Sequence, residues 1–240
     1  MAYLFVHEDR EYLLDPGERF ESDLGILEIP EDVEPGDVVE THLGNGFTVR
    51  RLRGPDLFNH LERTGAPMMP RDVGLVVGKT GVAAGDRVLD AGTGTGILSA
   101  YMGRLGADVV TYERDPEFAE VARQNMAVAG VEDAVEVRTG DVTDDLDQLS
   151  GFDVLTLDTE DAPTVVERTP TLLQRGGSLA VYSPFVENTR AAAEAATEVG
   201  LEQIETLDTI QREMDFDDRG SRPSTGGVGH TGYLTFARRP

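Results

Sequence analysis

The chain has 240 residues, 39% of them hydrophobic, which is enough for one α/β domain with its own core and a small additional domain. It contains no cysteine, which excludes disulfides, thiolate metal sites and a cysteine nucleophile, and it has no apolar run long enough to span a membrane. Its 45 acidic residues outnumber its 21 basic residues, so the net charge is −24.

The excess of acid allows two interpretations. A strongly acidic surface argues against a nucleic-acid partner. Lys79, however, is the single lysine, and acids occur along the whole chain, which favours adaptation to a salt-rich cytoplasm. At molar salt the Debye length falls to about 3 Å, so the charge does not exclude an RNA substrate. The first residues become charged too early for a signal peptide, and we expect a soluble cytoplasmic protein.

Residues 1–60 predict a small domain resembling a β-barrel. The segments LGILEIP, GDVVETHLG and GFTVRRL alternate apolar and polar residues, as strands with one buried face do. Gly44-Asn45-Gly46 predicts a tight hairpin turn between the last two, and Pro16-Gly17 and Pro35-Gly36 predict further turns.

A basic cluster and a bridging segment come next. Arg50, Arg51 and Arg53 form either a solvated surface or a contact for backbone phosphates. Asp56 is expected to cap a short helix that continues through Leu61, and Asp72 a helix that reaches about Lys79.

From Arg87 onward, strand and helix patterns alternate, which predicts a parallel sheet covered by helices on both faces. The expected strands cover residues 87–91, 109–113, 135–141, 152–158 and 178–184. The expected helices cover residues 116–130, 164–174 and 187–199. Two adjacent strands, 201–210 and 232–239, close the chain through a polar connection. The fold class is therefore α/β, with residues 61–240 forming the larger domain.

A glycine turn follows the first of these strands in RVLDAGTGTGIL, residues 87–98. Gly92, Gly94 and Gly96 permit a tight turn and a close ligand, and the helix that follows offers free N–H groups. With Asp90 the pattern is D-x-G-x-G-x-G, which differs from the dinucleotide pattern G-x-G-x-x-G. It resembles the first motif of S-adenosylmethionine-dependent methyltransferases, whose cofactor has a cationic sulfonium and no phosphate.

Four successive strands end in acids, at the edge where parallel sheets bind ligands. Glu113 lies 21 residues after Gly92, the spacing of an acid that receives ribose hydroxyls. Asp141 suits the adenine amino group of the cofactor, and Asp158 lies where the methyl acceptor is expected. Each acid alone is equally compatible with a helix cap or a solvated carboxylate. The residues expected to bind S-adenosylmethionine are Asp90, Gly92, Thr93, Gly94, Thr95, Gly96, Ile97, Glu113, Arg114, Asp141, Val142 and Asp158.

Missing motifs narrow the chemistry further. Without cysteine, methylation at C5 of a pyrimidine is disfavoured, and the N/D-P-P-Y/F motif of enzymes that methylate exocyclic amino groups does not follow the fourth strand. The four histidines lack the spacing of a metal site, so no metal is expected.

Over nearly its full length the chain resembles bacterial and archaeal tRNA (adenine-N1)-methyltransferases. The matching stretches are GDVVETHLG, GFTVRRL, PRDVGLVV, VLDAGTGTGILS, TYERDPEF, GDV, LTLD and GHTGYLTFARRP. The resemblance implies a Rossmann-like class I methyltransferase domain, with a seven-stranded sheet and an antiparallel terminal strand, behind a small β domain. It also implies tRNA as substrate, a homotetramer, and transfer of a methyl group from S-adenosylmethionine to N1 of one or both of two adjacent T-loop adenines.

By this resemblance Asp158 is the catalytic acid, and a carboxylate suits the reaction. Adenine N1 carries a lone pair, but the methylated base stays cationic until its 6-amino group loses a proton. A carboxylate that accepts a hydrogen bond from that amino group orients the base and raises the electron density at N1. The base must first be flipped out of its stack.

The chain departs from the family around the acceptor. Met69-Pro70-Arg71-Asp72 replaces the common Tyr-Pro-Lys-Asp, and residues 159–163 replace Leu-Pro-x-Pro-Trp in a chain without tryptophan. The residue that stacks on the flipped base and the choice between adjacent adenines therefore stay open. Met69, Arg71, Arg212 and Arg222 are the expected substrate contacts.

Three other functions are considered. A non-catalytic RNA-binding subunit of the same fold is disfavoured because the glycines, Glu113 and Asp158 are retained. A nicotinamide-dependent oxidoreductase is disfavoured by the glycine spacing. A methyltransferase with another substrate, such as protein isoaspartate, does not account for the GHTGYLTFARRP ending.

Overall fold

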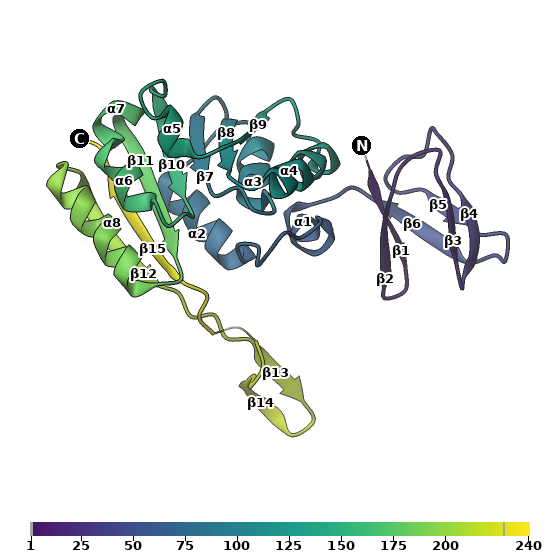
Figure 1. The fold of residues 1–240 in the computed structure, drawn as a ribbon. Helices are drawn as coiled ribbons and strands as arrows, with labels where there is room; N and C mark the ends of the chain where they lie inside the picture. The colour runs from purple at the N-terminus through teal and green to yellow at the C-terminus, as the bar shows by residue number, and fades with distance from the viewer. Residues whose placement is uncertain (1, 228) are drawn as a thin grey trace.

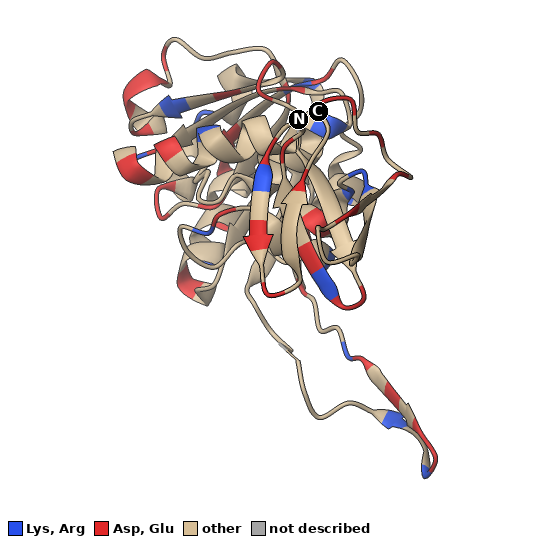
Figure 2. Ribbon diagram, turned by 90° about the vertical axis from the view of Figure 1, so that its right-hand side faces the viewer, with Lys and Arg blue, Asp and Glu red and all other residues tan. Residues whose placement is uncertain are grey.

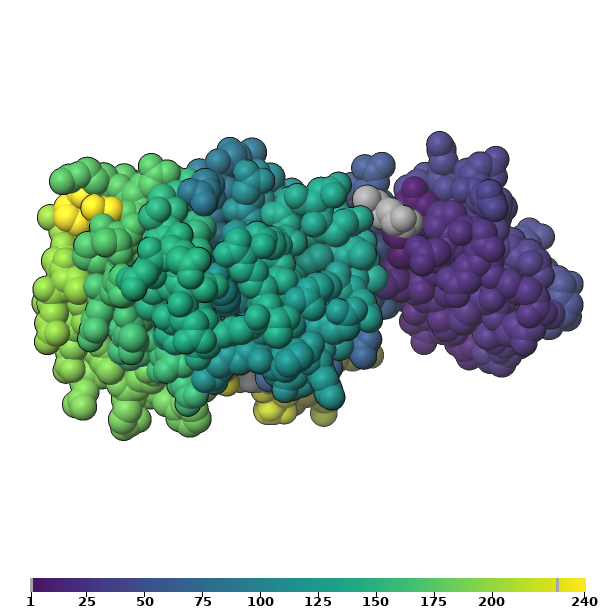
Figure 3. All heavy atoms as spheres, turned by 45° about the horizontal axis from the view of Figure 1, so that its top comes forward, coloured from purple at the N-terminus to yellow at the C-terminus, as the bar shows by residue number. Residues whose placement is uncertain are grey.

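The computed structural model describes residues 2–227 and 229–240 and contains two lobes joined by a narrow neck (Figures 1 and 3). The smaller lobe is built from strands alone. The larger lobe is a seven-stranded sheet between two layers of helices, and a thin hairpin projects from it (Figure 1). Among the described residues, none of the helices combines the length and the apolar character needed to cross a membrane.

The smaller lobe holds a four-stranded antiparallel sheet in the order β2-β1-β6-β5 and a separate β3-β4 hairpin. Its core centres on Phe5, Leu27 and Phe47, which are completely buried. The predicted turn lies in the connection between β5 and β6, but Gly46 is already the first residue of β6 and pairs with Glu40. The first three strands were not predicted: β1 is only five residues long, and charged residues interrupt the apolar pattern of β2 and β3. The strands are β1 (Tyr3–His7), β2 (Arg10–Leu14), β3 (Arg19–Ser22), β4 (Gly25–Glu28), β5 (Val38–Glu40) and β6 (Gly46–Arg50).

The neck consists of α1 (Gly54–His60) and the residues around it. Leu52, Leu57 and Leu61 are buried in the core of the larger lobe, so this segment packs with the sheet rather than with the smaller lobe. The predicted cap differs in detail. Asp56 lies inside the first turn, where its carboxylate accepts the Arg53 backbone N–H at 2.6 Å.

The prediction that Asp72 caps the second helix is wrong. Helix α2 (Pro70–Thr80) begins earlier, because Pro70 supplies a first helical residue that needs no N–H partner, and Met69 is the residue before it. Asp72 lies buried in the first turn, where the side chain is available for tertiary contacts.

The large sheet has the order β12-β15-β11-β10-β7-β8-β9, and only β15 runs antiparallel to its neighbours. This confirms the predicted α/β fold with a seven-stranded sheet and an antiparallel terminal strand. The order places the ends of β10, β7, β8 and β9 next to one another. The strands are β7 (Arg87–Ala91), β8 (Asp108–Glu113), β9 (Val135–Thr139), β10 (Phe152–Leu157), β11 (Leu173–Ser183), β12 (Glu202–Asp208) and β15 (Tyr233–Arg238).

Two hydrophobic cores cover the faces of this sheet. Successive strand residues point to opposite faces, so Val88 joins one core and Leu89 the other. The first core packs under α2, α3 (Ile97–Arg104) and α4 (Pro116–Ala129). The second packs under α5 (Val142–Asp145), α6 (Ala162–Glu167), α7 (Thr169–Leu172) and α8 (Val186–Glu198). Burial on both faces explains the nearly continuous apolar strands of the sequence.

Two sequence predictions in the last third of the chain are wrong. The single helix over residues 164–174 is two short helices, α6 and α7, and Pro170 near the start of α7 has no N–H to continue the first. Strand β11 then begins at Leu173, so Gly176-Gly177 lies inside a strand instead of ending a helix. The polar connection contains a hairpin of β13 (Met214–Asp217) and β14 (Gly220–Pro223), which projects from the lobe (Figures 1 and 2).

Candidate active site

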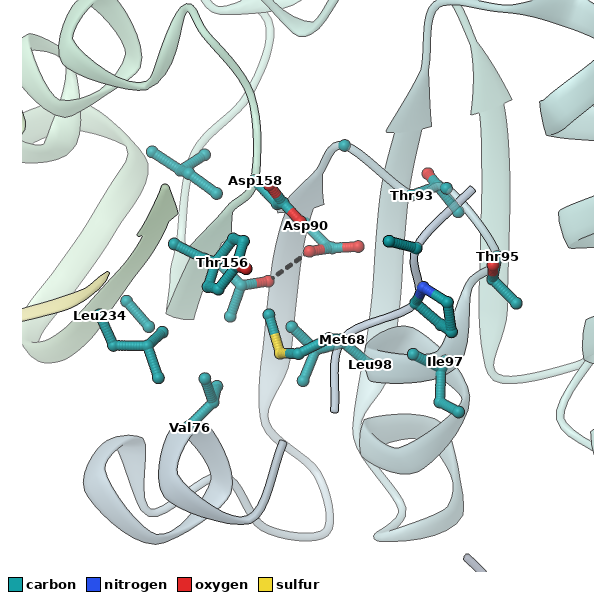
Figure 4. Close-up of a pocket in the computed structure, with 17 residues that line it drawn as sticks. Met68, Val76, Asp90, Thr93, Thr95, Ile97, Leu98, Thr156, Asp158 and Leu234 are labelled. Carbon is teal, nitrogen blue, oxygen red and sulfur yellow. Dashed lines mark hydrogen bonds between the residues drawn. The ribbon is translucent and has the colours of Figure 1, made fainter. Parts of the chain in front are cut away.

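Two adjoining hollows lie at the carboxyl ends of the parallel strands. The first is bounded by the glycine turn, the end of β10, β11 and the coil before α2 (Figure 4). The second lies over the ends of β8 and β9. Both are lined by Gly92, Gly94 and Asp158, so one extended ligand can occupy both hollows and pass Asp158 between them.

The glycine turn is pressed against the segment that follows β10. Gly92 has φ +90°, and a Cβ atom there would lie 2.0 Å from the carbonyl oxygen of Asp158. The Asp158 N–H donates to the Ala91 carbonyl at 2.8 Å, which holds the two segments together. Gly96 has φ +80° and begins α3, and a Cβ there would lie 2.4 Å from the Met126 methyl group. Glycine at these positions therefore brings Asp158 to the turn.

The two threonines of the turn differ in their hydrogen bonding. The Thr93 hydroxyl pairs with the Thr111 hydroxyl at 2.6 Å. The Thr95 hydroxyl oxygen is buried, lines the first hollow, and has no hydrogen-bond partner among the described residues. Because an unpaired buried hydroxyl costs roughly 1–3 kcal/mol, Thr95 fits a ligand whose polar end reaches the first hollow.

Asp90 is the most enclosed of the predicted acids. Its carboxylate accepts hydrogen bonds from the hydroxyls of Ser99 at 2.8 Å, Thr111 at 2.7 Å and Thr156 at 2.6 Å, the last of which is drawn in Figure 4. Burial raises the pKa of Asp90, and these three hydrogen bonds oppose the rise. Both carboxylate oxygens thus accept hydrogen bonds from residues of α3, β8 and β10. The side chain fixes the strand end that precedes the glycine turn, and it also lines the first hollow.

Glu113 and Asp141 lie together at the second hollow. Glu113 accepts the Gly94 N–H at 2.9 Å and the Asp115 N–H at 3.1 Å, which orients its carboxylate beside the turn. Asp141 caps α5, and the backbone N–H and hydroxyl of Thr143 lower its pKa. Two carboxylate side chains in one hollow can accept hydrogen bonds from hydroxyl and amino groups of a nucleoside.

Arg114 bridges the loops that follow β8, β9 and β10. Its guanidinium lies 3.0 Å from Glu160, 3.4 Å from Asp161 and 3.9 Å from Asp141. The hydrogen bond to Glu160 raises the pKa of Arg114. Arg114 lines the second hollow at its solvent side, where these contacts tie its rim together. Val142, the first residue of α5, is buried beneath the same hollow.

Asp158 follows β10 directly and is accessible to solvent through the two hollows. The surrounding protein nevertheless limits how well water can hydrate its carboxylate. This desolvation, with smaller contributions from the negative charges of Asp90 and Glu113, raises the pKa of Asp158 to about 7. Asp158 can therefore gain or lose a proton near neutral pH, which suits an acid–base role.

The rest of the first hollow is apolar, and its lining was not predicted from the sequence. In the view of Figure 4 the apolar side chains lie together below Asp90 and Asp158. They come from the coil before α2 and from α2, α3 and β15, which no local motif connects. The labelled members are Met68, Val76, Ile97, Leu98 and Leu234. A flat aromatic base is compatible with such a wall.

A buried polar latch joins the coil at the end of the hairpin to the start of α2. Arg71 donates to the Gly229 carbonyl at 3.3 Å and to the Thr231 hydroxyl at 3.2 Å. The Thr231 hydroxyl donates to Asp72 at 2.8 Å, and the Tyr182 hydroxyl donates to the Thr231 carbonyl at 2.9 Å. Tyr182 also lines the first hollow, so the latch supports its wall. Arg71, a predicted substrate contact, is buried within this latch.

The other predicted substrate residues lie away from the hollows. Met69 is half-buried just before α2, next to Met68, which lines the first hollow. Arg212 lies at the base of the projecting hairpin, and Arg222 lies on β14, 3.7 Å from Asp215. The predicted cofactor residues therefore lie together around the two hollows, whereas Arg212 and Arg222 lie at the projecting hairpin.

The described residues also bear on metal binding. Within residues 2–227 and 229–240 no group of three or more histidine, aspartate or glutamate side chains is arranged to hold a metal ion.

A family model described as "tRNA methyltransferase complex GCD14 subunit" matches residues 55–220. The chain belongs to this family. The chain is 33% identical over 272 aligned positions to tRNA (adenine(57)-N(1)/adenine(58)-N(1))-methyltransferase TrmI of Methanocaldococcus jannaschii. That match covers 100% of this chain and 95% of the relative, and it includes the GHTGYLTFARRP ending. The family predicted from the sequence is thereby confirmed.

Solved structures agree with this GCD14-family assignment. A SAM-dependent O-methyltransferase from Thermotoga maritima aligns with a TM-score of 0.82 and 25% identity, covering 99% of this chain and 92% of its own. The tRNA (m1A58) methyltransferase TrmI of Aquifex aeolicus aligns with a TM-score of 0.76 and 22% identity, covering 100% and 97%. The predicted Rossmann-like class I methyltransferase fold and its cofactor, S-adenosylmethionine, are confirmed.

The approach of Gly92 to Asp158 gives a first prediction. We expect Gly92→Ala to reduce the free energy of unfolding by on the order of 3 kcal/mol, since the new methyl group must displace the Asp158 backbone. The affinity for S-adenosylmethionine should fall more than tenfold. Chemical denaturation and isothermal titration calorimetry measure the two effects.

Gly81→Ala is the matched control for Gly92→Ala. Gly81 also has a positive φ, +70°, but a Cβ atom there would meet nothing within 4 Å. Its cost should stay at about 1–2 kcal/mol, with cofactor affinity unchanged. Equal effects of the two substitutions would show that the contact with Asp158 is unimportant.

Proposed function

We propose that this protein transfers a methyl group from S-adenosylmethionine to N1 of an adenine in the T-loop of tRNA. The observation that carries the proposal is Asp158, a carboxylate with a pKa of about 7 between two adjoining hollows. Similarity to the Methanocaldococcus jannaschii enzyme along the whole chain supports the choice of substrate. That relative's name includes two adjacent adenines, and we propose that this enzyme acts on one or both equivalents.

The residues of the second hollow suit the adenosine part of the cofactor. We assign the ribose hydroxyls to Glu113 and the adenine amino group to Asp141. The unpaired Thr95 hydroxyl and the backbone of Gly92 and Gly94 suit the polar methionine end, which enters the first hollow. When bound, S-adenosylmethionine supplies an electrophilic methyl group on its sulfonium. Asp90, Thr93, Gly96 and Ile97 support the turn, and Arg114 and Val142 its neighbouring loops.

Asp158 has two tasks in this proposal. Its ionised carboxylate first accepts a hydrogen bond from the 6-amino group of the flipped adenine, which orients N1 and raises its electron density. Once N1 is methylated the base is cationic, and the carboxylate accepts the proton that the 6-amino group releases. A pKa near neutrality suits both holding and passing on that proton. The apolar wall of the first hollow excludes water around the base.

The alternatives are less well supported. A non-catalytic subunit would have no use for an acid with a shifted pKa between two hollows. A methyltransferase for protein isoaspartate does not account for the latch between Arg71 and Thr231, which unites the PRD and GHTGY stretches found in the sequence. Methylation of tRNA is therefore the function that the site favours.

We further propose that the chain is divided into domains of residues 1–60 and 61–240, with α1 as the joint, and that it acts as a homotetramer in the cytoplasm. The projecting hairpin supports self-association, because Phe216 is 78% exposed and Ile210 68% exposed. Acidic residues occur on both lobes and on the hairpin (Figure 2). Together with the single lysine, they support adaptation to high salt.

The central experiment uses a tRNA transcript, S-adenosylmethionine and the variant Asp158→Asn. The wild-type protein should form N1-methyladenosine in the T-loop, as measured by mass spectrometry of digested tRNA. Asp158→Asn should lower kcat by a factor of about 10² to 10⁴, because the amide cannot accept the proton. Cofactor affinity should change less than threefold. A wild-type protein that binds S-adenosylmethionine but leaves the T-loop unmodified would refute the proposed function.

The pKa of Asp158 predicts a pH profile. Because the pKa is raised to about 7, the carboxylate is protonated below that value, and kcat should fall as the pH decreases through 7. The folded protein also retains this proton above the ordinary value of 3.8, so stability from this group falls as the pH rises from 3.8 to 7. Asp158→Asn should remove both dependences. An unchanged kcat between pH 5.5 and 8.5 would exclude Asp158 as the proton acceptor.

The exposed apolar residues of the hairpin predict that it forms a contact between subunits. Phe216→Ser should shift the protein from a tetramer toward smaller species, because it removes the most exposed apolar side chain of the hairpin. Analytical ultracentrifugation measures the change. Leu43→Ser, at a residue of the smaller lobe that is 63% exposed, is the control and should leave the assembly unchanged. Identical sedimentation of both variants and the wild type would exclude the hairpin as the contact.

A further inference from the structure

Three arginines of the neck lack the acidic partners that many other arginines of the chain have. Arg10, Arg114 and Arg138 each lie 2.6–3.0 Å from a carboxylate. Arg50, Arg51 and Arg53 are exposed, and their guanidinium groups contact no carboxylate of the described residues. What distinguishes this cluster is that three arginines fall within four positions of a chain with 45 acidic residues, which concentrates positive charge where an external anion can bind.

The backbone holds this cluster in a fixed position. Leu52, between Arg51 and Arg53, is only 4% exposed and is anchored in the core of the larger lobe. Its carbonyl accepts a hydrogen bond from Arg104 at 3.0 Å, and Arg104 also donates to the Ala129 carbonyl at 3.0 Å. The flanking arginines are therefore presented by rigid backbone, which lowers the entropic cost of binding.

Two of the nearby acids are already engaged. Asp56 accepts the Arg53 backbone N–H at 2.6 Å, and Glu11 lies 3.2 Å from His60. Arg104 adds positive charge at the same place, and its pKa is lowered by burial and by repulsion from Arg53. The positive charge of the neck thus remains available to a ligand.

A short path leads from the neck to the glycine turn. Helix α1 has seven residues and spans about 10 Å. At its far end the buried amide of Asn125 bonds the Glu62 N–H at 3.0 Å and the Glu62 carbonyl at 2.8 Å. The same amide donates to the Thr95 carbonyl at 2.9 Å, so residue 62 lies against the turn.

Arg63 extends the positive charge along the chain toward the residues that line the first hollow. It follows Glu62 directly, donates to the Phe58 carbonyl at 3.1 Å, and lies 5.1 Å from the centre of the Phe58 ring. These contacts orient the guanidinium without neutralising it. The coil then continues to Ala66, Pro67 and Met68, which line the hollow.

We propose that Arg50, Arg51, Arg53 and Arg63 form a neck strip that binds the phosphate backbone of tRNA and guides the target base to the first hollow. The inference rests on the proposed function and adds the surface that grips the substrate. Guanidinium groups bind phosphate oxygens in pairs, and a polyanion matches a row of arginines better than a single acidic group does. A concentrated strip also explains how a chain of net charge −24 binds RNA.

The test compares Arg51→Gln/Arg53→Gln with a matched double variant, Arg175→Gln/Arg190→Gln. Both remove two positive charges, but Arg175 and Arg190 lie outside the neck and the hollows. KM for tRNA and kcat are measured over a series of KCl concentrations. The neck variant should raise KM for tRNA about tenfold at the lowest salt and reduce the slope of log KM against log salt by about 1.5, since each phosphate contact contributes roughly 0.7–0.9.

Further measurements separate this proposal from the proposed function. The affinity for S-adenosylmethionine and kcat at saturating tRNA should stay within twofold of wild type in the neck variant. Arg51→Lys/Arg53→Lys should restore most of the salt slope because it keeps the charge. If the neck variant matches the control in KM and slope while the wild type methylates tRNA, the strip is refuted and the function stands. A wild type without activity refutes the function itself.

Discussion

The site depends on the close approach of the glycine turn to the strand end beside it. Gly92 has no side chain, and a Cβ atom at this position would lie only 2.0 Å from the carbonyl oxygen of Asp158. The two segments can therefore approach this closely only with glycine at position 92. This contact puts Asp158 between the hollow suited to the adenosine part of the cofactor and the hollow suited to the acceptor base. The protein around the carboxylate limits its hydration, and this desolvation raises its pKa to about 7.

Buried polar contacts keep that arrangement in place. Asp90 collects hydroxyl groups from α3, β8 and β10, and the latch of Arg71, Asp72 and Thr231 fastens the chain after the hairpin to α2. Buried polar groups are costly unless they are paired, so these networks favour one arrangement of the elements around the hollows. The latch also connects the wall of the first hollow to the base of the hairpin that we propose as an assembly contact. The same group of contacts therefore links the proposed cofactor and acceptor sites to the proposed assembly surface.

Electrostatics divides the molecule into two environments. The chain as a whole has an excess of acidic residues, and their mutual repulsion is screened when salt is high. Phosphate binding under those conditions needs arginines that are close together and already ordered, because long-range attraction is lost. The neck offers such a group at the end of a rigid path of about 10 Å along α1 to the glycine turn. Net charge alone is thus a poor guide to the partners of this chain.

The sequence by itself determined the α/β class, the glycine turn, the acids at the strand ends and the family, because these depend on patterns within one strand–turn–helix unit or on motifs of a few residues. Only the tertiary structure decided which groups each acid contacts. The three hydroxyls around Asp90 come from distant segments, and Arg71 meets Thr231 across 160 positions of the chain. The hairpin of β13 and β14 was missed because each of its strands has only four residues, too few for a pattern to stand out in a polar segment. Contacts between distant segments carry no local pattern, so their partners become visible only when the chain is folded.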